Sequence, residues 1–180
     1  MTCIVALVHE NKVYMGGDAA GSDGTVLQLV SHPKVFKLGE FLIGYTSSFR
    51  MGQLLEFNLE VPASAELDDL RYMVRTFIPA VRKCLADGGF SKKNNEQEEG
   101  GTFIVGYRGK IYEVGSNYHC LLLQDKYLAC GSGYTFALAS IETYISQVDG
   151  WEPVKAIEEA LRVAAKFNPD VRPTFTVLSL

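Results

Sequence analysis

The sequence predicts an α+β fold, a four-layer αββα sandwich in which two stacked antiparallel sheets are flanked by helix pairs. Three observations support this prediction. Short apolar runs come in pairs joined by tight polar turns, helical periodicity follows them in two places, and several runs are apolar at successive positions. Hairpins give antiparallel sheets whose outer faces helix pairs must cover, and stacked sheets explain strands with two apolar faces. An ordinary two-layer α+β fold is the alternative.

The first half of the chain supplies two predicted hairpins and then two predicted helices. The turn-like HENK joins the strands of the first hairpin, and Gly39-Glu40 joins those of the second. The four expected strands are 3–8, 13–17, 34–38 and 41–46. The polar, glycine-rich AAGSDG segment after Asp18 is expected to be a loop. Apolar residues then recur at helical spacing over 48–60 and 66–86.

The second half begins with a polar segment at 87–101, DGGFSKKNNEQEEGG, which is expected to be an exposed and mobile loop. Strand character then returns in two further pairs of runs. The four expected strands are 102–107, 110–114, 119–123 and 126–130. Two helices are expected at 133–147 and 153–167, with Pro153 at a favourable first-turn position, and a last strand at 174–179.

Length and charge limit the class of protein. With 180 residues, 47% of them hydrophobic and 21% charged, the chain is expected to form one domain over residues 1–180. A net charge of −4, without a Lys/Arg-rich segment interleaved with aromatics, excludes nucleic acid as an expected partner. No apolar stretch approaches the roughly 20 residues of a membrane helix, and the opening run lacks the basic flank of an export signal. We therefore expect a soluble, cytoplasmic protein without a membrane partner.

The cysteines and histidines do not have metal-ligand spacing. They are Cys3, Cys84, Cys120 and Cys130, and His9, His32 and His119. The cysteines form no CxxC pair, and the histidines form no cluster with them, so reduced buried thiols are expected rather than disulfides or a metal site. No cofactor is expected either.

Three residues near the N-terminus suggest nucleophilic catalysis when they are considered together. They are the hydroxyl of Thr2, the carboxylate of Asp18 and the amine of Lys34. A free α-amino group has a pKa of about 8 and can accept the proton of its own residue's hydroxyl. A buried ammonium beside them would lower the pKa of both groups, and a carboxylate would keep that ammonium charged and oriented. Separately, each residue could serve as a strand start, a turn cap or a surface cation.

These residues and their intervals resemble the proteasome β-subunits and the bacterial HslV peptidase, which are N-terminal-nucleophile (Ntn) hydrolases. In that family a threonine opens the mature chain, an acid lies sixteen residues later, and a lysine lies sixteen residues after the acid. Thr2, Asp18 and Lys34 reproduce both intervals. The phrases TCIVALVHENKVYMGGDAAGSDG and PKVFKLGEFLIGYTSS resemble the family's two opening hairpins, and LRVAAKFNPDVRPTFTVLSL resembles its closing helix and strand. The resemblance is loosest between residues 50 and 100, and it implies the Ntn hydrolase fold.

The resemblance also assigns roles to residues. Thr2 matches the nucleophile, Asp18 its acid partner and Lys34 the activating cation. Three further positions match the family later in the chain. Gly44, in LIGYT, matches the oxyanion-hole glycine, Ser132, in GSG, matches a serine that helps the α-amine move its proton, and Asp170 is assigned to the late acid with Asn168 as the alternative.

Two departures from the family pattern concern the nucleophile. Only Met1 precedes Thr2, and its excision, as in HslV, is expected to expose the α-amine. Cys3 stands where many relatives have a second threonine. Because neighbouring strand residues point to opposite faces, Cys3 is expected to face away from the site, although it remains an alternative nucleophile.

The resemblance implies a threonine-type peptidase that acts within a homo-oligomeric ring on peptides or unfolded polypeptides, with an AAA+ unfoldase as partner. Two other functions remain open. One is a non-catalytic ring or scaffold subunit that retains Met1, and the other is a small-molecule Ntn amidase. The lack of long insertions that could build a small-molecule pocket disfavours the amidase.

Overall fold

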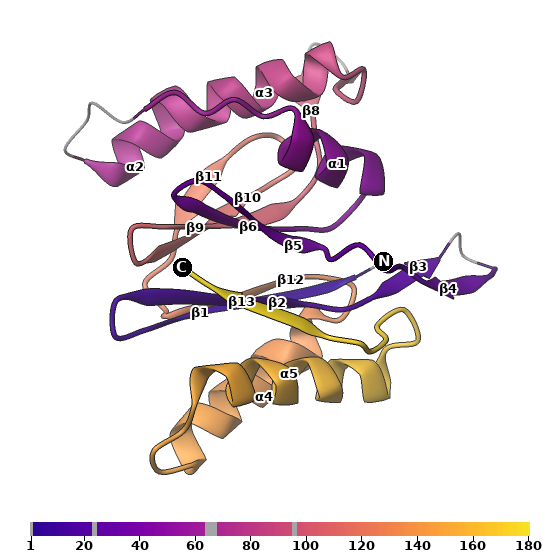
Figure 1. Cartoon of the computed structure of the whole chain (residues 1–180), viewed down its shortest axis with the longest axis vertical. Coiled ribbons are helices and arrows are strands. Elements are labelled where there is room, and N and C mark those ends of the chain that lie inside the picture. Colours follow the sequence, from indigo (N-terminus) through magenta and orange to yellow (C-terminus); the bar gives the residue numbers. More distant parts are fainter. Residues whose placement is uncertain (1, 23–24, 64–67, 95–96) are drawn as a thin grey trace.

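The computed structural model describes residues 2–22, 25–63, 68–94 and 97–180. Two antiparallel sheets lie face to face, with one group of helices beyond each sheet (Figure 1). The predicted mixture of helices and antiparallel sheets is therefore confirmed. Within the described residues, no helix is both long and apolar enough to cross a bilayer.

The first sheet has four strands in the order β12-β1-β2-β13. Its strands are β1 (Cys3–His9), β2 (Lys12–Gly17), β12 (Tyr127–Gly131) and β13 (Thr176–Ser179). The hairpin β1–β2 lies in the centre and places Ile4 opposite Gly17, as the first predicted hairpin requires. The ends of the hairpin that carry Thr2 and Asp18 are therefore neighbours.

The second sheet has five strands in the order β11-β10-β9-β6-β5. They are β5 (Val35–Leu38), β6 (Phe41–Tyr45), β9 (Phe103–Tyr107), β10 (Lys110–Val114) and β11 (Cys120–Leu122). The second predicted hairpin, β5–β6, forms one edge of this sheet. Lys34 immediately precedes β5, so it reaches the Thr2 end of the first sheet only because the two sheets are stacked.

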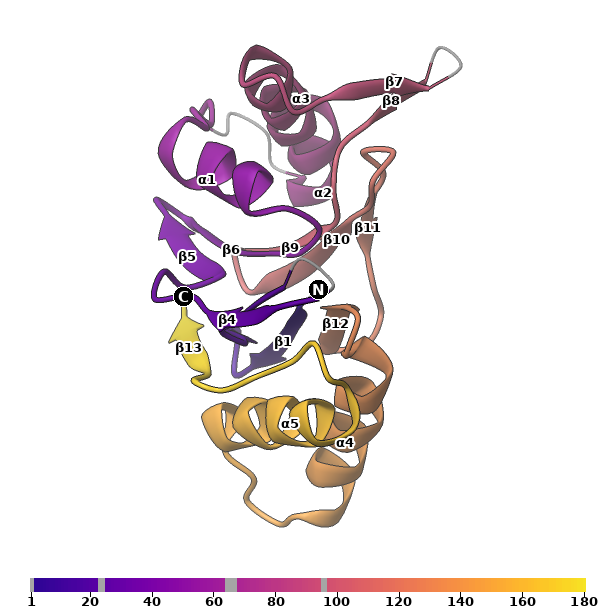
Figure 2. The ribbon, with the colours of Figure 1, turned by 90° about the vertical axis from the view of Figure 1, so that its right-hand side faces the viewer.

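Helices cover the outer face of each sheet (Figures 1 and 2). Beyond the five-stranded sheet lie α1 (Phe49–Phe57), α2 (Asp69–Tyr72), η1 (Met73–Phe77) and α3 (Ile78–Asp87). Beyond the four-stranded sheet lie α4 (Tyr134–Gln147) and α5 (Pro153–Phe167). The Ser48 side chain caps α1 by accepting hydrogen bonds from the amides of Arg50 and Met51. The predicted helix at 66–86 is α2, η1 and α3 in succession, with one π-helical turn; residues 66 and 67 lie outside the described residues.

The core consists of three apolar clusters, one between each pair of adjacent layers. Strand β1 shows why its sequence is apolar throughout. Cys3, Val5 and Leu7 pack toward α4 and α5, whereas Ile4 and Ala6 pack between the sheets. Because successive side chains point to opposite faces, both faces of β1 are buried, as its run of successive apolar residues predicts.

Two segments predicted as loops contain short hairpins, so those predictions are wrong in part. Strands β3 (Ala20–Ser22) and β4 (Leu27–Leu29) pair next to the chain's N-terminal end. Strands β7 (Lys92–Asn94) and β8 (Gln97–Glu99) pair and project beside α3 (Figure 2). In the second hairpin Lys92 lies opposite Glu99, and Arg82 of α3 forms an ion pair with Glu98 at 2.7 Å. Cross-strand pairs of opposite charge stabilise a polar hairpin that lacks an apolar pattern.

Candidate active site

Thr2, Asp18 and Lys34 meet where the ends of β1, β2 and β5 come together. The residues are only 4%, 2% and 1% exposed, respectively. The Lys34 Nζ donates to Thr2 Oγ1 at 2.9 Å and to Asp18 Oδ1 at 3.0 Å. The three side chains that the sequence intervals selected are therefore joined in one hydrogen-bonded chain, with the amine in the middle.

Backbone amides from three segments fix the Asp18 carboxylate. Oδ1 accepts from the Cys3 amide at 3.0 Å, and Oδ2 accepts from the amides of Ala20 at 2.9 Å and Arg172 at 3.3 Å. With Lys34, the carboxylate has four donors, which come from β1, the start of β3, the segment before β5 and the turn before β13.

Burial and charge act on Lys34 in opposite directions. Burial lowers the pKa of Lys34 from its ordinary value, because desolvation disfavours the ammonium. The negative charge and the hydrogen bond of Asp18 oppose that shift and favour the ammonium. The Lys34 amine is therefore buried between the Asp18 carboxylate, which favours its charged form, and the Thr2 hydroxyl.

The GSG segment at Ser132 lies against the Thr2 backbone. Ser132 Oγ is 3.3 Å from the Thr2 nitrogen, which donates to it, and 3.3 Å from the Thr2 carbonyl oxygen, to which it donates. Gly131, at the end of β12, has a φ of +96°, and a Cβ on it would lie 2.2 Å from the Thr2 carbonyl oxygen. Only glycine fits there, so the predicted Ser132 is brought to the Thr2 nitrogen by a glycine-dependent turn.

The late acid predicted from the resemblance, Asp170, reaches the site indirectly. The side chain that contacts the Ser132 segment is that of Asn168, whose Nδ2 donates to the Ser132 carbonyl at 2.7 Å. The backbone amide of Asp170 donates to Asn168 Oδ1 at 2.8 Å. The alternative residue, Asn168, therefore makes the contact, and Asp170 holds it in place through its main chain.

Gly44 lies inside the five-stranded sheet, where its backbone pairs with Val35 of β5 and Ile104 of β9. A Cβ on Gly44 would lie 2.6 Å from both Ile4 and Met15 of the facing sheet. This glycine allows the two sheets to approach each other closely next to Thr2. Its predicted role in an oxyanion hole stays a prediction.

Ser47, shortly after Gly44 in the chain, was not predicted as a site residue. It adopts a φ of +66°, a backbone conformation that is energetically unfavourable for residues other than glycine. Its hydroxyl accepts a hydrogen bond from the Thr102 amide at 3.1 Å. Non-glycine residues in this region cluster at functional sites. A serine in a polar turn carries no sequence signal for such a conformation.

The alternative nucleophile Cys3 faces away from Thr2, as predicted from strand alternation. It is fully buried in the cluster beneath α5, and burial raises the pKa of its thiol to about 12, with Asp18 adding to the shift. A thiol that stays protonated is a poor nucleophile. All four cysteines are free; Cys3 and Cys130 are buried, as predicted, whereas Cys84 and Cys120 are only partly buried.

Two residues after β6 differ in their relation to the site. Met51 is fully buried in the core, whereas the Phe49 ring is 41% exposed and its centroid lies 5.9 Å from Lys34 Nζ. Phe49 therefore borders the site, and Met51 does not.

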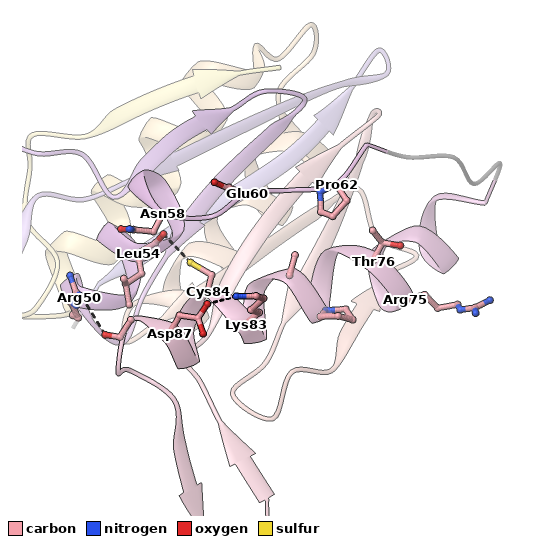
Figure 3. Close-up of a pocket in the computed structure, with 13 residues that line it drawn as sticks. Arg50, Leu54, Asn58, Glu60, Pro62, Arg75, Thr76, Lys83, Cys84 and Asp87 are labelled. Atoms are coloured by element: carbon pink, nitrogen blue, oxygen red, sulfur yellow. Dashed lines mark hydrogen bonds and ion pairs between the residues drawn. The ribbon is translucent and has the colours of Figure 1, made fainter.

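A hollow of about 780 Å³ opens between α1 and α3 (Figure 3). The Cys84 thiol there donates to the Leu54 carbonyl at 3.3 Å, Arg50 donates to the Gly88 carbonyl, and Lys83 pairs with Asp87. Its lining includes none of the predicted catalytic residues. Among the described residues, no group of three or more His, Cys, Asp or Glu side chains is arranged to hold a metal ion.

Comparisons with known proteins show the fold. No protein-family model and no curated protein sequence matches this chain. Among solved structures, a Thiobacillus denitrificans BPH in complex with epoxomicin is similar with a TM-score of 0.81, 14% identity, and 99% of this chain and 98% of that chain covered. Eukaryotic HslV from Trypanosoma brucei is similar with a TM-score of 0.70, 20% identity and 99% of both chains covered. An Anbu mutant from Hyphomicrobium sp. strain MC1 is similar with a TM-score of 0.70, 16% identity, and 98% of this chain and 80% of that chain covered. At these identities the likeness shows that the chain shares the fold of HslV, Anbu and BPH.

Proposed function

We propose that this protein is a threonine-type peptidase in which Thr2, freed by removal of Met1, is the nucleophile. The observation that carries the proposal is the contact of Lys34 Nζ with both Thr2 Oγ1 at 2.9 Å and Asp18 Oδ1 at 3.0 Å. Burying an amine and a carboxylate together costs desolvation free energy, and such buried ionisable groups cluster at functional sites. The likeness to HslV, and to a BPH that binds epoxomicin, supports a hydrolase of this kind.

In the proposed reaction, Thr2 Oγ1 attacks the peptide carbonyl carbon and the α-amine accepts the hydroxyl proton. Lys34 stabilises the developing negative charge on Oγ1, and Ser132, 3.3 Å from the Thr2 nitrogen, assists the movement of the proton. The C–N bond then breaks as the leaving amine takes that proton, which leaves an ester on Thr2. Water, deprotonated by the α-amine, hydrolyses the ester, releases the carboxylic acid and restores Thr2.

The tetrahedral intermediate needs a backbone N–H donor for its oxyanion. Gly44 is the donor that the family resemblance implies. The strained Ser47, at φ +66°, offers a second amide close in sequence. Gly44 lies within β6 and Ser47 just after it, on either side of Tyr45, whose amide donates to the Lys34 carbonyl at 3.0 Å.

We further propose the context of this activity. The chain forms a single domain over residues 1–180, with the two sheets and two helix groups making the four-layer αββα sandwich of Ntn hydrolases. It works in the cytoplasm as a homo-oligomeric ring, which restricts access to peptides and unfolded polypeptides, with an AAA+ unfoldase as the partner that delivers them. No nucleic acid, membrane, metal or cofactor takes part.

The test is a covalent adduct combined with matched variants. Protein whose N-terminus is verified as Thr2 by mass spectrometry should gain the mass of one epoxyketone per chain and hydrolyse fluorogenic peptides. T2A should lose both properties, and C3A, which changes the neighbouring residue, should keep both. Equal hydrolysis by T2A and wild type, or loss of the adduct in C3A alone, would refute the proposal.

The same experiment separates the other candidate functions. Native protein with Met1 intact and no adduct would indicate a non-catalytic ring or scaffold subunit. An adduct together with turnover of simple acyl amides but not of peptides would indicate a small-molecule amidase.

A further inference from the structure

The turn between α5 and β13 is bonded to two separate parts of the candidate site. At one end the Arg172 amide donates to Asp18 Oδ2 at 3.3 Å, and the Arg172 carbonyl accepts from the Ala19 amide at 2.9 Å. At the other end Asn168 Nδ2 donates to the Ser132 carbonyl at 2.7 Å. The conformation of this turn therefore determines where both Asp18 and Ser132 lie relative to Thr2.

The guanidinium of Arg172 closes the turn on itself. Its Nη1 donates to the carbonyl oxygens of Asn168 at 3.2 Å and Val171 at 2.7 Å. Val171 is fully buried, and its amide also donates to the Asn168 carbonyl, at 3.3 Å. Carbonyls at a helix C-terminus carry partial negative charge, so a cation beside them is stabilising.

We propose that Arg172 is a positioning residue of the active site, which holds Asp18 and Ser132 in register by fixing the turn that connects them. The proposal rests on the proposed threonine peptidase function. Arg172 makes no contact with Thr2 Oγ1 itself; it acts through its own backbone amide on Asp18 and through Asn168 on Ser132. Loosening the turn should displace the carboxylate that supports Lys34, and displacements of about 1 Å can cost about 100-fold in rate.

The kinetic test compares R172A and R172K with a matched arginine on α5. Arg162 pairs with Glu159 at 2.5 Å on the exposed face of the helix, so R162A removes an arginine and an ion pair away from the site. R172A should lower kcat about 10-fold or more with KM changed less than about two-fold, because positioning acts on the chemical step. R172K should recover most of that loss, millimolar methylguanidine should partly restore R172A, and R162A should match wild type.

A second measurement does not depend on activity. The Ala19 and Ala20 amides donate to the Arg172 carbonyl and to Asp18, so their hydrogen exchange reports on the turn. In ¹⁵N-labelled protein, R172A should speed exchange of both amides about 10-fold relative to R162A, and R172K should restore protection. If wild type is no more active than T2A, the proposed function fails, while the exchange rates still decide the role of Arg172.

The proposal is overturned if folded R172A keeps the wild-type kcat and the wild-type exchange rates. It is also overturned if kcat falls but neither R172K nor methylguanidine restores it and exchange is unchanged. If R172A does not fold, R172Q, which keeps N–H donors without the charge, takes its place. A folded R172Q and R172K that both retain wild-type kcat and protection would equally refute the positioning role.

Discussion

Replacing Asp18 with asparagine should be among the most damaging single substitutions in this protein. The carboxylate oxygen lies 3.0 Å from Lys34 Nζ, and the two side chains are 0% and 1% exposed. At an effective dielectric constant of about 20, two unit charges at that distance attract by about 5 to 6 kcal/mol. Breaking a buried ion pair by removing one partner typically costs about 3 to 5 kcal/mol, and we expect the free energy of unfolding of D18N to fall by that amount.

The hydrogen-bond pattern explains why asparagine cannot substitute for the carboxylate. Oδ1 accepts from Lys34 and the Cys3 amide, and Oδ2 accepts from the amides of Ala20 and Arg172. An asparagine side chain has one acceptor oxygen, so in either orientation its NH₂ group faces two donors. The loss of the negative charge also lowers the pKa of Lys34 further, because burial is then less opposed.

The effect on catalysis follows from the contact between Lys34 and Thr2. A hydrogen bond from a charged donor contributes about 1.5 to 3 kcal/mol, so its loss in the transition state should slow peptide hydrolysis about 10- to 150-fold. The assays are urea unfolding followed by circular dichroism and hydrolysis of a fluorogenic peptide.

The matched control for D18N is D69N. Asp69 also accepts from a lysine, Lys110 at 2.8 Å, but that lysine is 45% exposed, so the pair should contribute less than about 1 kcal/mol. If D18N loses no more stability than D69N and hydrolyses peptides at the wild-type rate, then the buried pair neither supports Lys34 nor activates Thr2, and the reasoning is refuted.

Four other substitutions test separate parts of the structure. S132A should slow peptide hydrolysis about 10-fold. Its free energy of unfolding should stay within about 0.5 kcal/mol of the wild-type value, because Ser132 is exposed. Equal hydrolysis rates of S132A and wild type would show that Ser132 has no part in the mechanism. F49A should favour peptides with larger side chains at the cleavage site, since the Phe49 ring stands 5.9 Å from Lys34 Nζ; unchanged rate ratios across a peptide series would contradict this. Folding raises the pKa of the Cys3 thiol from 9.0 to about 12. Above pH 9 the unfolded state therefore binds fewer protons than the folded state, and the free energy of unfolding falls by about 1.4 kcal/mol per pH unit. C3A should flatten that slope in urea unfolding between pH 9 and pH 10.5, and an unaltered slope would show that other groups dominate. The buried Tyr112 hydroxyl has no hydrogen-bond partner within the described part of the chain, so Y112F should raise the unfolding free energy by about 1 kcal/mol; a loss of that size would reveal a partner.

Part of the site follows from local sequence rules. The apolar runs that became β1 and β2 are joined by a short turn, and an antiparallel hairpin returns the chain to where it began. Ile4 consequently pairs with Gly17, so Asp18 comes opposite Cys3, the neighbour of Thr2. The proximity of Thr2 and Asp18 could be predicted without knowledge of the rest of the fold.

Lys34 could be placed only with the help of the family resemblance. It precedes a strand of the other sheet, and nothing in strand periodicity says which end of one sheet stacks over which end of another. Glycine residues on the facing sides of the two sheets allow the sheets to approach each other closely. A Cβ on Gly17 of the first sheet would lie 3.1 Å from Val35 of the second, so a side chain there would crowd the residue that follows Lys34.

The backbone donors to Asp18 and the choice between Asn168 and Asp170 could not be read from the sequence. An amide of Ala20 or Arg172 has no residue-type signature, and its direction depends on tertiary contacts. After α5 ends at Phe167, the chain turns so that the Asn168 side chain meets the Ser132 carbonyl, whereas Asp170 contributes a backbone amide. A one-residue difference in where a helix ends decides which side chain faces inward.

The strand order of the first sheet determines how late in synthesis the candidate site can assemble. Strand β2, which leads into Asp18, has β1 on one side and β13, at Thr176–Ser179, on the other. Ser132 and Arg172, which contact Thr2 and Asp18, also come from late in the chain. A ribosome-bound polypeptide that has exposed its first hundred residues still lacks β13 and the contacts made by Ser132 and Arg172. In the proposed mechanism, Thr2 would therefore remain unreactive toward its own unfinished chain, and toward other nascent proteins, until β13 has been synthesised.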